Sequence, residues 1–378
     1  MEITNDLHNN HNVYILGAGF SRLRGLPLIS DFMMQMRDAL EFHAGANHKR
    51  ECDAIKAVLN FRLKASSAAY RIQIDLENIE ELFSLASASP NPMEESIRLA
   101  IAATLDYSLQ SRKPQEAGFT ASRDAFVDSL IWQFESSPFT TPAGSWRVPA
   151  YEYIVNTMLG SGARNFAGLE NSFITFNYDT LLEDSLSSLN VPYSLGFDES
   201  GTPRSGLGTR VLKLHGSVNW AVPKGSRTAI KVFDSYRDVV NEGLSPQLVP
   251  PTWKKDSRGA FNAIWSESLK VLADATRVVV IGFSIPPTDL HFKYLLAVGL
   301  QNNYSLREIV FVNPGEGLNL VKDRCRDLFA NHEHNAAKVR FVDSTAEAFM
   351  GQGTDPFHTW SISRPVPESL QQLTFRAI

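Results

Sequence analysis

Five short apolar segments, each followed at once by small or polar residues, constrain the fold of this chain more than any other feature. They begin at Val13, Phe173, Val211, Val278 and Ile309. The residues that follow them are Gly17-Ala18-Gly19-Phe20-Ser21, Asn177-Tyr178-Asp179, His215-Gly216-Ser217, Gly282-Phe283-Ser284 and Asn313-Pro314. Short apolar runs bounded by turn residues are typical of buried strands. Because ligands of open parallel sheets bind outside the carboxyl ends of the strands, these clusters predict one shared crevice.

The order of strand and helix patterns predicts an α/β fold. From about residue 170 the two patterns alternate, which favours parallel strands joined by helical crossovers. Between 45 and 168 strand patterns nearly vanish and helical spacing recurs. We predict a doubly wound, mostly parallel Rossmann-like sheet over 1–44 and 169–350, with a helical insertion at 45–168. Within the sheet domain, 218–262 lacks periodicity and is expected to run over the sheet edge or the pocket mouth. The tail, 351–378, is expected to be extended; it either contacts another subunit or is disordered.

Composition excludes several classes of function. The chain of 378 residues has 36 basic and 41 acidic residues and a net charge of −5, so direct nucleic-acid binding is not expected. Its two cysteines, Cys52 and Cys325, are too few for a cysteine-rich zinc module or a disulfide framework. We find no apolar run of membrane-spanning length and no signal-peptide pattern at the polar start. The sequence therefore predicts a cytoplasmic protein without a zinc module.

The first cluster has the residue types of a phosphate site. Glycines such as Gly17 and Gly19 let backbone N–H groups approach a pyrophosphate at a helix start, and Ser21 adds a hydroxyl. The third glycine of the dinucleotide fingerprint is missing. The alternative is a tight strand-to-helix turn that binds no ligand.

Asn177 and His215 are candidates for catalysis, and Asp179 is a candidate for ligand binding. A strand-end amide such as that of Asn177 needs partners, and a ligand would supply them. Asp179 has a structural alternative at the start of the next helix, where Thr180 and Glu183 have capping-box spacing. An ordinary imidazole titrates near neutrality, so His215 is a candidate general base, although a lone histidine is more often structural.

Ser284 and Asn313 follow the later strands. Both residue types bond ribose hydroxyls or an adenine edge. The alternatives are a turn before Pro286 and an Asn-Pro turn at Asn313.

Taken together, these residues resemble the sirtuin superfamily. The loop from Gly17 to Ser21 is similar to its first NAD loop, and Gly25-Leu26-Pro27 is similar to the Gly-Ile-Pro that follows. Thr175-Phe176-Asn177-Tyr178-Asp179 resembles Thr-Gln-Asn-Ile-Asp, and His215-Gly216 resembles the catalytic His-Gly. Gly282-Phe283-Ser284 and Asn313 resemble the later Gly-Thr-Ser and the Asn on the adenosine side.

The resemblance implies NAD as substrate, Asn177 and His215 as catalytic residues, and ten NAD-binding residues. These are Gly17, Ala18, Gly19, Phe20, Ser21, Pro27, Asp179, Gly282, Ser284 and Asn313. The chain departs from the protein deacylases in lacking two Cys-x-x-Cys pairs and in its helical insertion. Both departures resemble NAD-hydrolysing effectors of bacterial anti-phage defence, of the stand-alone type that pairs with a HerA-type hexameric ATPase.

We therefore expect an NAD glycohydrolase that yields nicotinamide and ADP-ribose without a metal, assembles as a homo-oligomer and has low resting activity. Two alternatives stay open at this stage. One is ADP-ribosyl transfer or deacylation, in which an acceptor replaces water. The other is a subunit that senses NAD or ADP-ribose without turnover.

Overall fold

The computed structural model describes the following parts of the chain: residues 11–69, 71, 74–90, 93–111, 119–122, 145–148, 150–159, 171–198, 200–202, 208–226, 229–251, 260–286, 290–328 and 339–349. The predicted tail, 351–378, lies outside these residues. Among the described residues, no helix is both long and apolar enough to cross a lipid bilayer.

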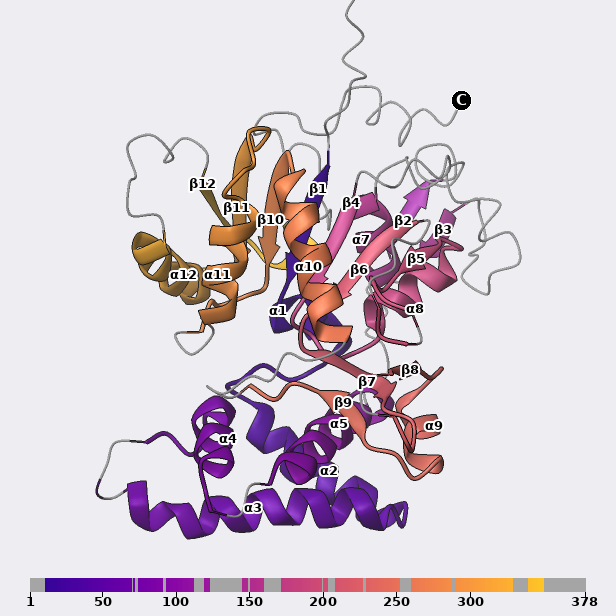
Figure 1. The fold of residues 1–378 in the computed structure, drawn as a ribbon, viewed down its shortest axis with the longest axis vertical. Helices are drawn as coiled ribbons and strands as arrows, with labels where there is room; N and C mark the ends of the chain where they lie inside the picture. Colours follow the sequence, from indigo (N-terminus) through magenta and orange to yellow (C-terminus); the bar gives the residue numbers. More distant parts are fainter. Residues whose placement is uncertain are drawn as a thin grey trace, which may run out of the picture.

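A seven-stranded sheet, parallel throughout, forms the centre of the fold (Figure 1). Its strands, in spatial order, are β12 (Val339–Asp343), β11 (Glu308–Asn313), β10 (Arg277–Ile281), β1 (Asn12–Leu16), β4 (Asn171–Thr175), β6 (Thr209–Lys213) and β5 (Tyr193–Ser194). The chain builds outward from β1 in one direction and then returns to build outward in the other. This reversal makes the carboxyl end of β1 a topological switch point, where such sheets bind ligands.

Strand register places the predicted clusters at the same edge of the sheet. Leu16, the last residue of β1, lies opposite Thr175 of β4 and Ile281 of β10. Thr175 lies opposite Lys213 at the end of β6. The loops after these four strands therefore begin side by side.

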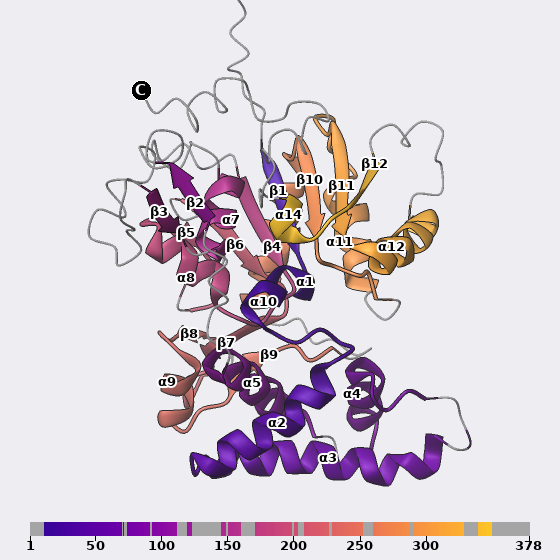
Figure 2. The ribbon, with the colours of Figure 1, turned by 180° about the vertical axis from the view of Figure 1, so that it is seen from behind.

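Both faces of the sheet are covered by helices, which confirms the doubly wound class. Tyr14 and Leu16 of β1 point to the face packed by α7 (Ala150–Leu159), α8 (Leu181–Ser188) and α14 (Ala346–Phe349), seen in Figure 2. Val13 and Ile15 point to the face packed by α10 (Ala260–Ala273), α11 (Leu290–Gly299) and α12 (Gly315–Leu328). The alternation explains why these strands are apolar at consecutive positions: each is buried on both sides.

A helical layer lies beyond the carboxyl edge of the sheet (Figure 1). It contains α2 (Phe32–Gly45), α3 (Lys49–Ala69), α4 (Ile79–Ser87) and α5 (Glu94–Ser111), and it is reached from β1 through α1 (Ala18–Ser21) and η1 (Arg22–Arg24). α2 packs on α3 and α5, whereas α7 packs on α8 beside the sheet. The range 45–168 thus contributes helices to both layers, and the predicted domain boundaries stay a prediction.

Two small antiparallel sheets differ from the sequence expectation. The range 218–262 was expected to run over the sheet edge or the pocket mouth. It overlaps a three-stranded sheet of β7 (Gly216–Ala221), β8 (Lys231–Val232) and β9 (Pro246–Leu248). The helix α9 (Tyr236–Asn241) lies between β8 and β9 in the sequence. This small sheet contacts α5 through β9. The second sheet, β2 (Phe119–Ser122) and β3 (Ser145–Val148), lies in the range predicted to be helical. None of these strands has the continuous apolar run that marks most strands of the central sheet, so the sequence pattern missed them.

Candidate active site

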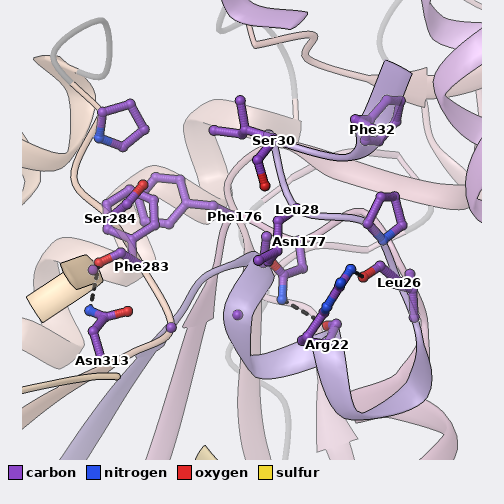
Figure 3. Close-up of a pocket in the computed structure, with 18 of the residues that line it drawn as sticks. Arg22, Leu26, Leu28, Ser30, Phe32, Phe176, Asn177, Phe283, Ser284 and Asn313 are labelled. Atoms are coloured by element: carbon purple, nitrogen blue, oxygen red, sulfur yellow. Dashed lines mark hydrogen bonds between the residues drawn. The ribbon is translucent and has the colours of Figure 1, made fainter. Parts of the chain in front are cut away.

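A cavity of about 890 Å³ opens at the carboxyl edge of the sheet, between the sheet and the helical layer. That volume is within the usual range for small-molecule sites. Of the twelve residues predicted for the site, all but Gly17 and Phe20 line it: Ala18, Gly19, Ser21, Pro27, Asn177, Asp179, His215, Gly282, Ser284 and Asn313. In Figure 3, Asn177 lies between a side formed by Phe283, Ser284 and Asn313 and a side formed by Arg22, Leu26 and Phe32.

The glycines of the first loop allow the loops after β1 and β10 to touch. A Cβ on Gly17 would stand 2.6 Å from Gly282 O, and one on Gly282 would stand 2.4 Å from Phe20 N. Gly282 also has a φ of +63°, in the left-handed region that favours glycine. The Gly17 N–H donates to Ile281 O at 3.0 Å, and the Gly19 N–H donates to Gly282 O at 2.9 Å. The two N–H groups expected to meet a pyrophosphate are therefore used within the protein, and the glycines have a packing role that the sequence prediction lacked.

Asn177, Ser21 and Asp179 form one chain of side-chain hydrogen bonds on the cavity wall. The Asn177 Nδ2 donates to Gly17 O at 2.9 Å and to Ser21 Oγ at 3.0 Å. Ser21 Oγ donates in turn to Asp179 Oδ2 at 2.8 Å. Within the described part of the chain, no hydrogen bond engages the Asn177 Oδ1, so this side chain offers an acceptor to a ligand or a water molecule.

Asp179 also has the structural role weighed as its alternative. Its Oδ1 accepts a hydrogen bond from the Leu181 N–H at 3.1 Å, at the start of α8. The capping box that the spacing of Thr180 and Glu183 allows is not formed, since the Thr180 side chain makes no capping hydrogen bond. Thr180 Oγ1 donates to Asp184 Oδ2 at 2.8 Å, and Glu183 turns inward to Lys213.

A buried ion pair supports this wall from beneath. Lys213, fully buried at the end of β6, lies 2.7 Å from Glu183 Oε1 and also donates to the backbone carbonyl of Asp179. Burial raises the pKa of Glu183, and the charge of Lys213 opposes that shift. Burial likewise raises the pKa of Tyr151, beside Ser21, well above its ordinary value. Buried polar side chains, those of Lys213, Glu183 and Tyr151, therefore lie next to the hydrogen-bonded chain of Asn177, Ser21 and Asp179.

His215 is held between aromatic rings. Its ring centroid lies 5.0 Å from that of Phe176, edge to face, and 6.0 Å from that of Tyr178, roughly parallel. Its carbonyl accepts the Val249 N–H at 2.9 Å, and Tyr178 donates its hydroxyl to Val249 O at 2.8 Å. These contacts fix a buried imidazole on the cavity wall, as a positioned general base requires.

Ser284 and Asn313 lie together at the other end of the cavity. The Asn313 Nδ2 donates to Phe283 O at 3.1 Å, which ties the loop after β10 to the end of β11. Arg324 of α12 donates to Ser284 O. Ile285 follows with a φ of +51°, unusual for a β-branched residue. The amide of Asn313 therefore shapes this loop as well as lining the cavity.

Several lining residues were not predicted from the sequence. Arg22 and Arg324 are the two positively charged ones among the described residues of the wall. Arg22 donates to Asp31 Oδ2 at 2.5 Å, yet 44% of its side chain is exposed. Because Arg22 directly follows the glycine loop, the sequence alone could have indicated that it lies near the ligand. Asn78, Glu80 and Leu105 come from the helical layer, and no local pattern marked them.

Comparison with known proteins adds one family match. Residues 171–335, less than half of the chain, match the model of a SIR2-like domain. The matched range includes Asn177, His215, Ser284 and Asn313. A comparison with curated proteins gave no significant match.

Two solved structures are similar in outline. One is a crystal structure of Sir2 with the inhibitor EX-527, 2′-O-acetyl-ADP-ribose and a deacetylated p53 peptide; it is 13% identical, 90% of each chain is covered, and the TM-score is 0.36. The other concerns the structural basis of sirtuin substrate affinity; it is 12% identical over 93% of this chain and 97% of that one, with a TM-score of 0.37. At TM-scores this low, no assignment rests on these two structures. What the comparisons show is therefore a similarity to a SIR2-like domain over residues 171–335.

Proposed function

We propose that this cavity binds NAD and hydrolyses its nicotinamide–ribose bond to nicotinamide and ADP-ribose. The observation that carries the proposal is the convergence of Asn177, Asp179 and His215 on one cavity at the switch point of the sheet. The SIR2-like match over 171–335 includes all three residues.

The charges of the wall suggest how a dinucleotide lies. Ser284 and Asn313 offer hydrogen-bonding groups to the adenosine end, while Asn177, Asp179 and His215 surround the nicotinamide riboside. The diphosphate between them carries two negative charges. Because the glycine N–H groups are already bonded, we assign those charges to Arg22, with Arg324 at the adenosine side. Arginine suits this role, since its planar guanidinium makes charge-assisted bonds to phosphate.

The proposed reaction needs one positioned water and one base. The glycosidic bond breaks through an oxocarbenium-like state, and its electron pair neutralises the nicotinamide ring, which leaves uncharged. The water oxygen bonds to the anomeric carbon and its proton passes to His215. Asn177 Oδ1 accepts a hydrogen bond from that water or from the ribose. Phe176 and Tyr178 keep the imidazole in place and shield it from bulk solvent.

We further propose that the activity serves anti-phage defence by depleting NAD, with low resting turnover raised by assembly. Support for this part comes from the resemblance to stand-alone defence effectors, and it extends to a homo-oligomer and a HerA-type ATPase partner. Constant high turnover of the isolated chain at cellular concentration would contradict the regulated form of the proposal.

The test is to incubate the purified chain with NAD, alone and with a candidate ATPase, and to separate the products by chromatography. We expect equal amounts of nicotinamide and free ADP-ribose, abolished by Asn177→Ala and by His215→Ala. His291→Ala is the matched control, because His291 lies on α11 against Trp265 and outside the cavity wall. Nicotinamide without free ADP-ribose would instead identify a transferase, and NAD bound but uncleaved in both conditions would identify a sensor.

A further inference from the structure

Three metal-ligand side chains meet in the helical layer, at the turn between α2 and α3. His43 is in the last turn of α2, His48 is in the connection, and Glu51 is in the first turn of α3. One potential ligand atom from each lies within 4.8 Å of the others. His43 and Glu51 are almost completely buried, at 0% and 2% exposure. None of the three lines the cavity described above.

The two imidazoles present their Nδ1 atoms to each other. His43 Nε2 lies 2.9 Å from the carbonyl oxygen of Ala103, an acceptor, so the proton belongs on Nε2. His43 Nδ1 then carries a lone pair directed at the cluster, 3.1 Å from His48 Nδ1. In a tetrahedral site with metal–nitrogen bonds of about 2.0–2.1 Å, two nitrogen ligands stand roughly 3.3 Å apart. A backbone carbonyl behind one imidazole is also the usual outer partner of a metal-bound histidine.

The carboxylate of Glu51 is also held by a hydrogen bond from a residue outside the cluster. Arg237 of α9 donates to Glu51 Oε1 at 2.8 Å, which leaves Oε2 as the atom for a metal. The same guanidinium donates to Asp106 of α5 and, at 3.3 Å, to His43 Nδ1, a hydrogen bond that a metal ion bound to Nδ1 would replace. With both histidines neutral, the two carboxylates and one guanidinium carry a net charge of −1. Arg237 therefore cancels one of the two negative charges and leaves the other.

We propose that His43 Nδ1, His48 Nδ1 and Glu51 bind one Zn²⁺ ion, with water completing the coordination. Two imidazoles and a carboxylate suit zinc, whereas calcium and magnesium prefer oxygen ligands alone. The ion links α2 to α3, and the hydrogen bond from Arg237 to Glu51 links both to α9. The role of the ion is therefore structural. The site is separate from the NAD chemistry, for which no metal was predicted, and it stands or fails independently of that activity.

The test measures metal content and its effect on stability. The full chain, without a histidine tag, is loaded with Zn²⁺, dialysed, and analysed by elemental mass spectrometry. We expect about one zinc per chain, and a visible absorption band typical of tetrahedral cobalt when Co²⁺ replaces it. Chelator should lower the melting temperature of the native chain and leave that of His48→Ala unchanged.

His48→Ala and Glu51→Gln should lose the metal, and His291→Ala should keep it. His48 is half-buried, so its alanine variant is the one expected to fold if Glu51→Gln does not. No bound zinc in the native chain would overturn the proposal and leave a hydrogen-bonded histidine pair beside Arg237. Equal zinc in the native chain and His48→Ala would also overturn it.

Discussion

Substitution of Arg22 should weaken NAD binding without affecting the stability of the fold. The ion pair of Arg22 with Asp31 is partly exposed and of little value for stability. A hydrogen bond from a charged group to a phosphate is worth about 1.5–3 kcal/mol, or roughly ten- to a hundredfold in affinity. We predict that Arg22→Ala weakens ADP-ribose binding by that factor in isothermal titration and leaves the melting temperature nearly unchanged. Arg37→Ala, which removes an exposed arginine paired with Glu77, should bind normally.

Substitution of Lys213, in contrast, should lower the free energy of unfolding. Removing one partner of a buried ion pair typically costs about 3–5 kcal/mol, because the remaining charge is stranded. We predict a loss of that order for Lys213→Met in denaturant unfolding at pH 8. The double variant Lys213→Met with Glu183→Gln should recover part of the loss, since no buried charge remains. A single variant as stable as the native chain would contradict the ion-pair assignment.

The cost of Lys213→Met should also depend on pH. The pKa of Glu183 is already raised above its ordinary value of 4.5 by burial, and losing Lys213 raises it further. A raised carboxyl pKa means that folding favours the protonated form, so this contribution is present at low pH and is lost as pH rises through the folded-state pKa. The destabilisation should therefore shrink as pH falls from 8 toward 5. A cost that is constant over this range would show that Glu183 does not carry it.

Among the elements, the paired loops after β1 and β10 leave no room for added volume. A Cβ on Gly17 meets Gly282 O and the Phe283 backbone, which cannot rotate away. Overpacking of this kind costs about 1–3 kcal/mol, and it would displace the residues that follow, including Ser21. We predict that Gly17→Ala lowers both stability and ADP-ribose affinity. Gly45→Ala is the control, because a Cβ added there would have nothing within 4 Å, and it should be neutral or slightly stabilising.

Strands were predictable from the sequence where burial on both faces left a continuous apolar run. β1, β4, β6, β10 and β11 belong to this group, and their shared edge followed from their being parallel. β7, β8 and β9 were missed because their sequences contain no continuous apolar run. The capping box at Thr180 is not formed because a partner distant in the sequence, the buried Lys213, binds Glu183.

On the scale of the whole molecule, the cavity belongs to both layers. Asn78, Glu80 and Leu105 reach it from helices whose position depends on the tertiary fold, which is why only the sheet half of the site was predictable. Arg324 was hidden for the same reason, inside an ordinary amphipathic helix. Apart from Pro27, the residues found from the sequence were those just after strand ends, where topology alone fixes their location.

Ligand binding between two layers should stabilise the fold as a unit. A ligand that binds only the folded state adds about 2.7 kcal/mol when its free concentration is a hundred times Kd. We predict that ADP-ribose raises the melting temperature accordingly, and that Arg22→Ala needs a higher concentration for the same shift. Adenosine, which lacks the diphosphate, should give a much smaller effect. Equal stabilisation by ADP-ribose and adenosine would contradict the assignment of Arg22 to the diphosphate.

The most direct measurement is a crystal structure of the chain grown with NAD. We predict electron density for ADP-ribose in the cavity, with its diphosphate beside Arg22, its adenosine near Ser284 and Asn313, and its freed ribose carbon facing Asn177 and His215. Such density would join the cleavage to this site. Density for a nucleotide elsewhere on the molecule, or an empty cavity at saturating NAD, would contradict the assignment.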